Sequence, residues 1–118
     1  MRVPSHPALI RRMLEARLKK LTPQGPALAA SLAEVKKTCG QPSCACHHGG
    51  PRHTAHHLTL KQDGHTRTVY VPVDLLDDVR KWVSEHQRLK HLQAEISQLT
   101  LALVTTHVTV RKRKKGRP

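Results

Sequence analysis

The stretch HLTLKQDGHTRTVYVP, residues 57–72, decides the fold of this 118-residue chain. Apolar and polar residues alternate on both sides of Asp63-Gly64, which is the pattern of two strands that each have one apolar face. An Asp-Gly pair between two such runs is the strongest short-range signal of a β-hairpin. A two-residue loop would place Leu58 opposite Val69, so the sequence predicts both the hairpin and its register.

Upstream of the hairpin, three cysteines stand within eight residues in the string CGQPSCAC, which runs from Cys39 to Cys46. A structural zinc site takes four sulfur or nitrogen ligands in a tetrahedron, and a turn rich in Gly and Pro lets the thiolates converge. Three cysteines this close together do not form a disulfide framework. We therefore predict a zinc knuckle with Cys39, Cys44 and Cys46 as ligands, and we expect the metal to fix the hairpin against the helices.

The fourth ligand must be a nearby histidine, and the candidates are His47, His48, His53, His56 and His57. We favour His53, because the spacer after Cys46 allows the chain to wrap back around the metal, whereas His47 and His48 follow that cysteine too closely. The simpler alternative is three free thiols without a metal. A Cys–His nucleophile would need an orienting group and an oxyanion site. Because nothing singles out one cysteine, we expect no enzymatic activity.

Downstream of Pro72, which should end the second strand, Asp74 is the expected N-cap of a long helix that runs from about residue 75 to about residue 104. Its apolar positions follow the alternating steps of three and four residues that are typical of a coiled coil. These positions are Leu89, Leu92, Ile96, Leu99 and Leu103. The stripe can fold back on an N-terminal helix or pair with a second copy of the chain. An earlier apolar face, which includes Trp82, should cover the hairpin.

An amphipathic helix is expected near the N-terminus, over residues 8–21, with Ser5 as its cap. Residues 22–26, TPQGP, should end that helix, and residues 27–38 fit either a helical turn or a third, short strand. The expected fold is α+β. Its segments are a basic helix with a linker (1–26), the knuckle and hairpin (27–73), the long helix (74–110) and a basic tail that is disordered when free (111–118).

The charge of the chain is strongly asymmetric. Lys and Arg number 21 against 8 Asp and Glu, which gives +13 before any of the 10 histidines is counted. Residues 1–38 carry a net +6, and the last eight residues hold six basic side chains and no acidic one. A nearly neutral middle between two basic ends indicates a polyanionic partner.

We expect that partner to be nucleic acid. The candidate contacts are Arg11, Arg12, Arg17, Lys19, Lys20, Lys36, Lys37, Arg111, Lys112, Arg113, Lys114, Lys115 and Arg117. Such side chains bind phosphates and supply affinity without sequence choice. Base stacking needs aromatic rings, and only Tyr70 and Trp82 are present. Tyr70 should lie opposite His57, and Trp82 is expected in the core, so we favour contacts to the backbone of duplex DNA.

The string CGQPSCAC, the downstream RH, the run TRTVYVP and a helix ending in ISQLTLAL resemble a widespread bacterial family of uncharacterised small proteins. The resemblance covers roughly residues 27–104. It implies a knuckle of Cys39, Cys44 and Cys46 with His53 as the downstream histidine. The chain departs from the family pattern at Ala55, His56 and His57, where such proteins tend to carry aromatic residues. Members of the family look like companions of mobile elements and recombinases.

The sequence thus predicts a small zinc-binding accessory protein that binds nucleic acid, in a recombination or transposition system. The alternative is a protein-interaction adaptor that uses the C-terminal helical stripe, and a thiol-redox protein is a third, minor possibility. No stretch of the sequence approaches the run of about 20 apolar residues that a membrane span requires, and the N-terminal residues MRVPSHPALIRRM lack the apolar run of a signal peptide. We therefore expect a cytoplasmic protein that does not use a membrane.

Overall fold

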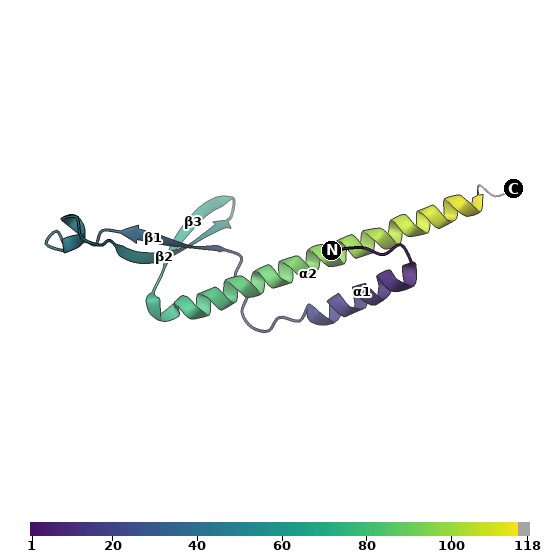
Figure 1. Cartoon of the computed structure of the whole chain (residues 1–118), viewed down its shortest axis with the longest axis horizontal. Coiled ribbons are helices and arrows are strands. Elements are labelled where there is room, and N and C mark those ends of the chain that lie inside the picture. Colours follow the sequence, from purple (N-terminus) through teal and green to yellow (C-terminus); the bar gives the residue numbers. More distant parts are fainter. Residues whose placement is uncertain (116–118) are drawn as a thin grey trace. The chain divides into compact units, whose positions relative to one another are not determined.

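The computed structural model describes residues 1–115, with side chains described as far as Arg113. Along the chain, one α-helix precedes and one follows a three-stranded antiparallel sheet, so the α+β prediction is confirmed (Figure 1). The elements in chain order are α1 (Pro7–Lys20), β1 (Ser31–Lys37), the 3₁₀ helix η1 (Ala45–His47), β2 (His53–Gln62), β3 (His65–Val71), the 3₁₀ helix η2 (Val73–Leu75) and α2 (Leu76–Lys115).

The hairpin of β2 and β3 has the predicted register, with Leu58 opposite Val69. Its loop consists of Asp63 and Gly64 alone, at φ angles of 52° and 80°. Both residues therefore adopt the left-handed conformation that a type I′ turn requires. The Asp-Gly pair accounts for the hairpin because these two residue types reach that conformation at low cost.

The ambiguous segment before the knuckle contains a strand. β1 pairs antiparallel with β2, which gives the order β1-β2-β3, and Leu32 lies opposite Leu58. Just before β1, the backbone N–H of Leu28 donates a hydrogen bond to the carbonyl of Trp82 at 3.0 Å. A third strand therefore extends the apolar face of the hairpin, and the helical alternative for residues 31–37 is excluded.

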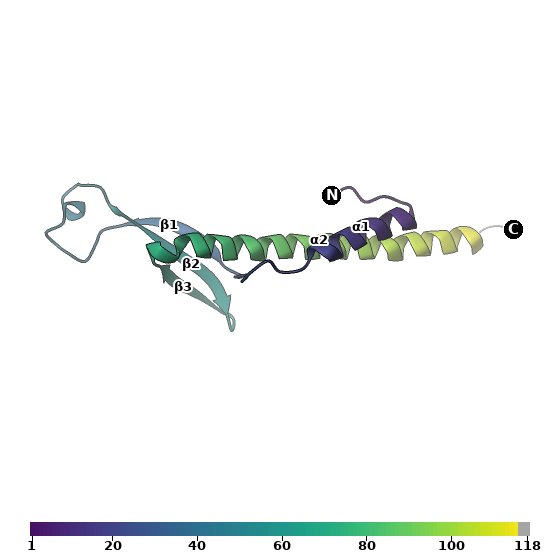
Figure 2. The same ribbon diagram turned by 90° about the horizontal axis from the view of Figure 1, so that it is seen from below.

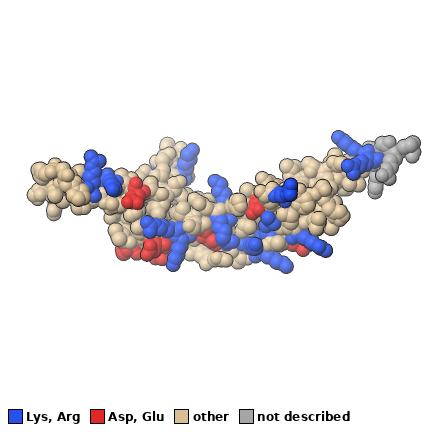
Figure 3. Space-filling view, viewed as in Figure 1, with Lys and Arg blue, Asp and Glu red and all other residues tan. Residues whose placement is uncertain are grey.

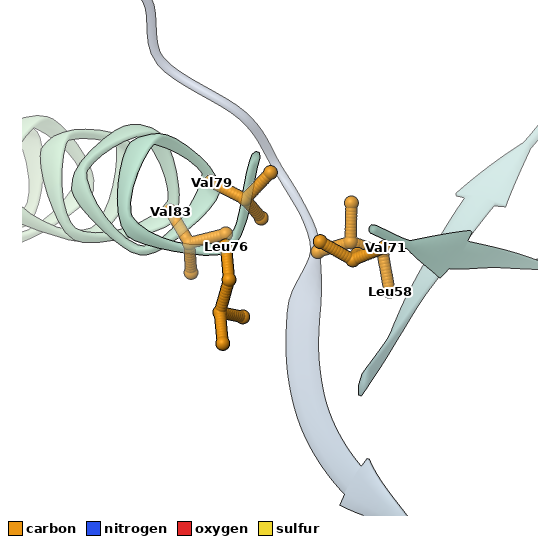
Figure 4. Packing of buried hydrophobic residues seen from close by; sticks show 5 residues of the cluster. All are labelled: Leu58, Val71, Leu76, Val79 and Val83. Carbon is orange, nitrogen blue, oxygen red and sulfur yellow. The ribbon is translucent and has the colours of Figure 1, made fainter. Parts of the chain in front are cut away.

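One face of the sheet packs on the first turns of α2 and forms the core of this part of the chain (Figure 4). Leu58 and Val71 come from the sheet, and Leu76, Val79 and Val83 come from the helix; each is at most 9% exposed. Partly buried side chains, including Trp82, pack around this cluster, as expected for the early apolar face of the helix. The core is aliphatic and small, which is typical of a domain that is stabilised further by a bound metal, a disulfide or a partner.

The chain divides into two compact units. Unit 2 comprises residues 25–86 with the sheet, and unit 1 comprises residues 1–24 and 87–118. In unit 1, α1 runs along α2 (Figure 2), and Ile10 and Leu99 are completely buried. Of the two partners considered for the apolar stripe, the structure shows the fold-back onto the N-terminal helix.

Two cap predictions were wrong. α1 is capped by His6 rather than Ser5, because the Nδ1 atom of His6 accepts a hydrogen bond from the Ala8 backbone N–H at 3.2 Å. Asp74 lies inside η2 and caps no α-helix, since the Leu75 N–H donates to the Pro72 carbonyl at 3.1 Å in a tight turn.

The predicted end of the long helix was also wrong. α2 continues past residue 104 and reaches Lys115, so most of the segment expected to be a disordered basic tail is helical. No Gly or Pro interrupts residues 104–115, and Gly116 is the first helix breaker. Nothing in this segment stops the helix, so the last regular apolar step placed its end too early.

Candidate metal centre

Four side chains converge in the connection between β1 and β2. The Sγ atoms of Cys39, Cys44 and Cys46 and one ring nitrogen of His53 all lie within 4.8 Å of one another. Cys39 follows β1 closely, Cys44 and Cys46 flank the start of η1, and His53 is the first residue of β2. The four residues that the sequence indicated are therefore close enough to hold a metal ion.

The individual distances fit a tetrahedral centre. The Cys39 and Cys46 sulfurs are 3.6 Å apart, and the Cys44 sulfur is 3.3 Å from Nε2 of His53. Zinc bound at about 2.3 Å to sulfur and about 2.0 Å to nitrogen has ligand–ligand edges of roughly 3.5–3.8 Å. These two separations are close to such edges, and three thiols with one imidazole are a donor set of structural zinc sites.

The other histidines considered as the fourth ligand have different roles. His47 contacts the Cys39 carbonyl through Nε2 at 2.6 Å, and His48 contacts the Pro42 carbonyl through Nε2 at 3.1 Å. Since a carbonyl only accepts, both ring nitrogens donate. Each histidine therefore connects two parts of the loop through a hydrogen bond. His56 and His57 lie within β2 opposite residues of β3, outside the four-residue cluster.

The thiols differ in acidity. A backbone hydrogen bond from Cys46 and a side-chain contact with His53 lower the pKa of the Cys44 thiol to about 6. A backbone hydrogen bond from Cys39 lowers the pKa of Cys46, but burial and the neighbouring Cys44 and Cys39 thiols outweigh it, so that this pKa is raised overall. Metal ligation requires thiolates, and the loop already stabilises one of them.

A glycine that the sequence analysis did not single out closes the loop. The Gly50 N–H donates to the Ala45 carbonyl at 2.8 Å, and a Cβ atom at position 50 would lie 2.6 Å from that oxygen. Gly49 precedes it at a φ of 81°. The His-His-Gly-Gly run after the last cysteine was the available signal, because a Gly pair marks a tight turn.

All four candidate ligands come from the β1–β2 connection, which includes η1, and from the first residue of β2, and none comes from α1 or α2. The expectation that the metal fixes the hairpin against the helices was therefore wrong. The centre joins the two ends of the β1–β2 connection, because its ligand positions are separated only by that loop.

The structure also places the basic residues. On α1, Arg11, Arg12, Lys19 and Lys20 are exposed, and Lys36 and Lys37 are exposed at the end of β1. Arg111, Lys112 and Arg113 are exposed on the last turns of α2, the side chains of Lys114 and Lys115 are not among those described, and Arg117 lies outside the described residues. Figure 3 shows Lys and Arg side chains along the helices of unit 1 and between the sheet and the far end of the β1–β2 connection.

Arg17 differs from the other candidate cations. Its guanidinium donates to Oε2 of Glu95 through Nε at 3.2 Å and through Nη2 at 3.1 Å, and its side chain is 22% exposed. Nη1 also donates to the Met13 carbonyl at 3.3 Å. Arg17 therefore holds α1 against α2 within unit 1.

The fold and the cluster define a small α+β protein with a Cys₃His centre that can bind a metal ion. The chain belongs to the family DUF6788, a domain of unknown function, whose family model matches residues 11–81. Comparisons with curated proteins and with solved structures gave no significant match. Among the helices that the structure describes, none is long and apolar enough to cross a bilayer.

Proposed function

We propose that this chain is a zinc-stapled accessory protein that binds the phosphate backbone of nucleic acid. One observation carries the proposal: unit 1 holds 14 Lys and Arg against two Glu, a net +12 of the chain's +13. A folded helical pair of this charge attracts a polyanion and releases its condensed counterions on binding. The remaining unit, which contains the metal centre, is nearly neutral at +1.

The proposed contacts are exposed side chains on two helices of one unit. They are Arg11, Arg12, Lys19 and Lys20 on α1 and Arg111, Lys112 and Arg113 on α2. Arg17 is left out because it pairs with Glu95. Contacts of this kind position a protein on duplex DNA without reading its bases, so we propose duplex DNA as the main partner.

The proposed metal is zinc, and its proposed role is structural. Four protein ligands complete a tetrahedron, whereas a catalytic zinc keeps one position for water or substrate. This supports a non-catalytic protein in a reducing compartment such as the cytoplasm, where thiolates persist. The resemblance of the motif string CGQPSCAC to bacterial companions of recombinases supports a place in a recombination or transposition system.

The salt dependence of binding to a labelled duplex tests the nucleic-acid proposal. The logarithm of the association constant should fall linearly with the logarithm of the salt concentration, with a slope of about −0.9 for each phosphate contact. Arg11→Gln with Arg12→Gln should make the slope shallower by about 1–2 units. The control is Arg80→Gln with Lys81→Gln, an equal loss of charge on an exposed pair in unit 2. Binding that does not depend on salt, or equal effects of the two pairs, would contradict the proposal.

Metal content measured by mass spectrometry tests whether the four candidate ligands bind zinc. The reduced, purified protein should carry one zinc per chain, Cys39→Ser should lose it, and His53→Ala should bind it at least about tenfold more weakly. His56→Ala is the matched control, because this histidine lies outside the cluster. A folded protein without metal, or equal effects of the two histidine variants, would refute the ligand assignment.

A second candidate function is a protein-interaction adaptor. Leu101, Val104 and Val108 are 61%, 56% and 45% exposed on α2, at steps of three and four residues. This face differs from the stripe that α1 covers, and an exposed apolar row on a helix is a usual docking surface for another helix. Leu101→Gln with Val104→Gln, which adds no charge to unit 1, should abolish association with a protein partner or a second copy but leave DNA affinity nearly unchanged, which separates the two functions.

A further inference from the structure

The outer face of the sheet, which faces away from the core of unit 2, is an open surface. Partners across the strands share a face, and Ala33, His57 and Tyr70 form one row of this face. Further rows are Ser31 with Thr59 and Thr68, Val35 with Ala55, Lys37 with His53, and Lys61 with Thr66. The opposite face carries Leu58 and Val71, which pack on α2. The sheet therefore has one covered face and one face free for a ligand.

Tyr70 is the main feature of this outer face. It is 59% exposed, although its neighbour Val71 is 3% exposed on the covered side. The rings of Tyr70 and His57 lie 6.0 Å apart at an interplanar angle of 70°, an edge-to-face contact. This contact limits the orientations of the tyrosine ring and leaves much of its surface open. An exposed aromatic ring held on a sheet is a platform on which an unpaired base can stack.

The charge of the face suits a polyanion. Among its described residues there is no Asp or Glu, and Lys37 and Lys61 lie exposed near its two ends. Lys37 lies opposite His53, and Lys61 follows His53 by eight positions along β2, which corresponds to about 27 Å at about 3.4 Å per residue. Two cations at this separation on either side of an aromatic ring can bind the backbone of a short single strand.

A polar atom without a partner lies in the same row. Nε2 of His57 is buried and makes no hydrogen bond within the part of the chain that the structure describes. An unsatisfied polar atom is destabilising unless a ligand or a water supplies the missing bond. Because this atom is buried, the proposed site rests on the exposed ring of Tyr70 and on the two lysines, and not on a bond to His57.

We propose that the outer face of the sheet binds single-stranded nucleic acid, with Tyr70 stacking on an unpaired base and Lys37 and Lys61 binding phosphates. This inference rests on the proposed function and adds a second binding site, for an unpaired segment of the nucleic acid. Duplex DNA does not fit this face, because its bases are already stacked and paired and offer no ring surface to Tyr70. The full chain would thus bind a nucleic acid that has both a duplex and an unpaired segment.

The test uses the zinc-loaded full chain and two labelled probes, an oligothymidine of about 12 nucleotides and a duplex, with affinity measured by fluorescence anisotropy. Tyr70→Ala should weaken binding of the single strand by at least about fivefold and change binding of the duplex by less than about twofold. Tyr70→Trp should keep or improve the affinity for the single strand, since the larger ring still stacks. Val73→Ala, at a residue that is 76% exposed outside the sheet, is the matched control and should have no effect.

The outcomes separate this inference from the proposed function. If the chain binds the duplex but Tyr70→Ala binds the single strand as tightly as the native chain does, the sheet-face site is refuted and the backbone-binding function stands. Loss of affinity for both probes by the same factor would equally overturn the site, because it indicates a general defect. If the native chain binds neither probe, both proposals fail. Circular dichroism of each variant confirms that its fold is retained.

Discussion

At the scale of single residues, the candidate metal centre depends on a close backbone approach at Gly50. The Gly50 N–H bonds to the Ala45 carbonyl, and a Cβ atom there would lie 2.6 Å from that oxygen and 2.9 Å from the Ala45 Cβ. Because the obstructing oxygen belongs to the backbone, the loop cannot relieve the clash by turning a side chain. The loop between the last cysteine and His53 would have to open.

We therefore expect Gly50→Ala to weaken zinc affinity by about tenfold or more, which corresponds to about 1.4 kcal/mol or more. Competition with a chromophoric chelator measures this affinity. Gly40→Ala is the matched control in the same loop, since a Cβ there meets no atom within 4 Å. If Gly50→Ala and Gly40→Ala bind zinc equally well, the close approach has no role in forming the site.

The sequence predicted which four residues come together better than it predicted the loop that holds them. Three cysteines within eight residues leave little freedom, and His53 followed from the length of the spacer. The hydrogen bonds of His47 and His48 within the loop could not be predicted, because they depend on which backbone carbonyls the folded loop presents. The same is true of Gly50, whose importance comes from a distance and not from its residue type alone.

At the scale of elements, a polar contact joins α1 to α2 in unit 1. The carboxylate of Glu95, on a side chain that is 16% exposed, accepts two hydrogen bonds from Arg17. Arg88 donates to the carbonyls of Lys20 and Thr22 at 2.8 and 3.0 Å, and thereby satisfies acceptors at the C-terminal end of α1. These contacts fix α1 in its fold-back position.

Removing the charge of Glu95 should destabilise unit 1. Glu95→Gln leaves Arg17 partly buried without its ion-pair partner, and we expect a loss of about 1–2 kcal/mol, between the values for surface and buried pairs. Thermal or urea unfolding followed at a probe placed in α1 measures the change. Glu15→Gln removes an exposed carboxylate from α1 itself and should have an effect of less than about 0.5 kcal/mol. Equal stabilities of the two variants would show that the ion pair is energetically neutral.

Loss of apolar volume should destabilise the chain on one face of α2 and have little effect on the other. Leu99 is completely buried and Leu101, two residues later, is 61% exposed. Leu99→Ala should lower the free energy of unfolding by about 2–4 kcal/mol, because it removes transfer energy and leaves a cavity. Leu101→Ala should change it by less than about 0.5 kcal/mol. A small effect of both substitutions in chemical denaturation would mean that α1 does not cover α2 in solution.

The success of the sequence analysis varied among the elements for physical reasons. The β2–β3 hairpin was predicted with its register because Asp63-Gly64 specifies one turn type. β1 stayed ambiguous because a seven-residue edge strand has too few positions for its periodicity to exclude a helix. The end of α2 was placed too early, because we judged it from the last regular apolar step and not from the absence of a breaker before Gly116.

At the scale of the whole molecule, the proposed duplex-binding cations lie in one unit, and the candidate metal centre and the proposed single-strand site lie in the other. The candidate metal ligands and the outer sheet face belong to unit 2, whereas unit 1 carries a net +12. The sequence showed that the charge lies at the two ends of the chain. It could not show that both ends join one unit, since that depends on the contacts between α1 and α2.

This division predicts that removing the metal has a local effect. The knuckle loop holds one buried apolar side chain, Cys46, so without metal it has little to keep it ordered. Treatment with a chelator should therefore remove hydrogen-exchange protection from the backbone amides of His48 and Gly50, which bond to the Ala45 carbonyl. The strands β2 and β3 should stay protected, because Leu58 and Val71 remain packed on α2.

The same treatment should leave the affinity for duplex DNA within about twofold of the metal-loaded value, because the exposed cations of α1 and α2 belong to unit 1. Hydrogen exchange and anisotropy on a single chelated sample measure both effects, and re-addition of zinc should restore protection of the loop. If chelation instead unfolds the sheet, the core of unit 2 is too small to persist without its staple. If the sheet persists but duplex affinity collapses, the knuckle itself contacts the duplex, and the charge of unit 1 alone does not explain binding.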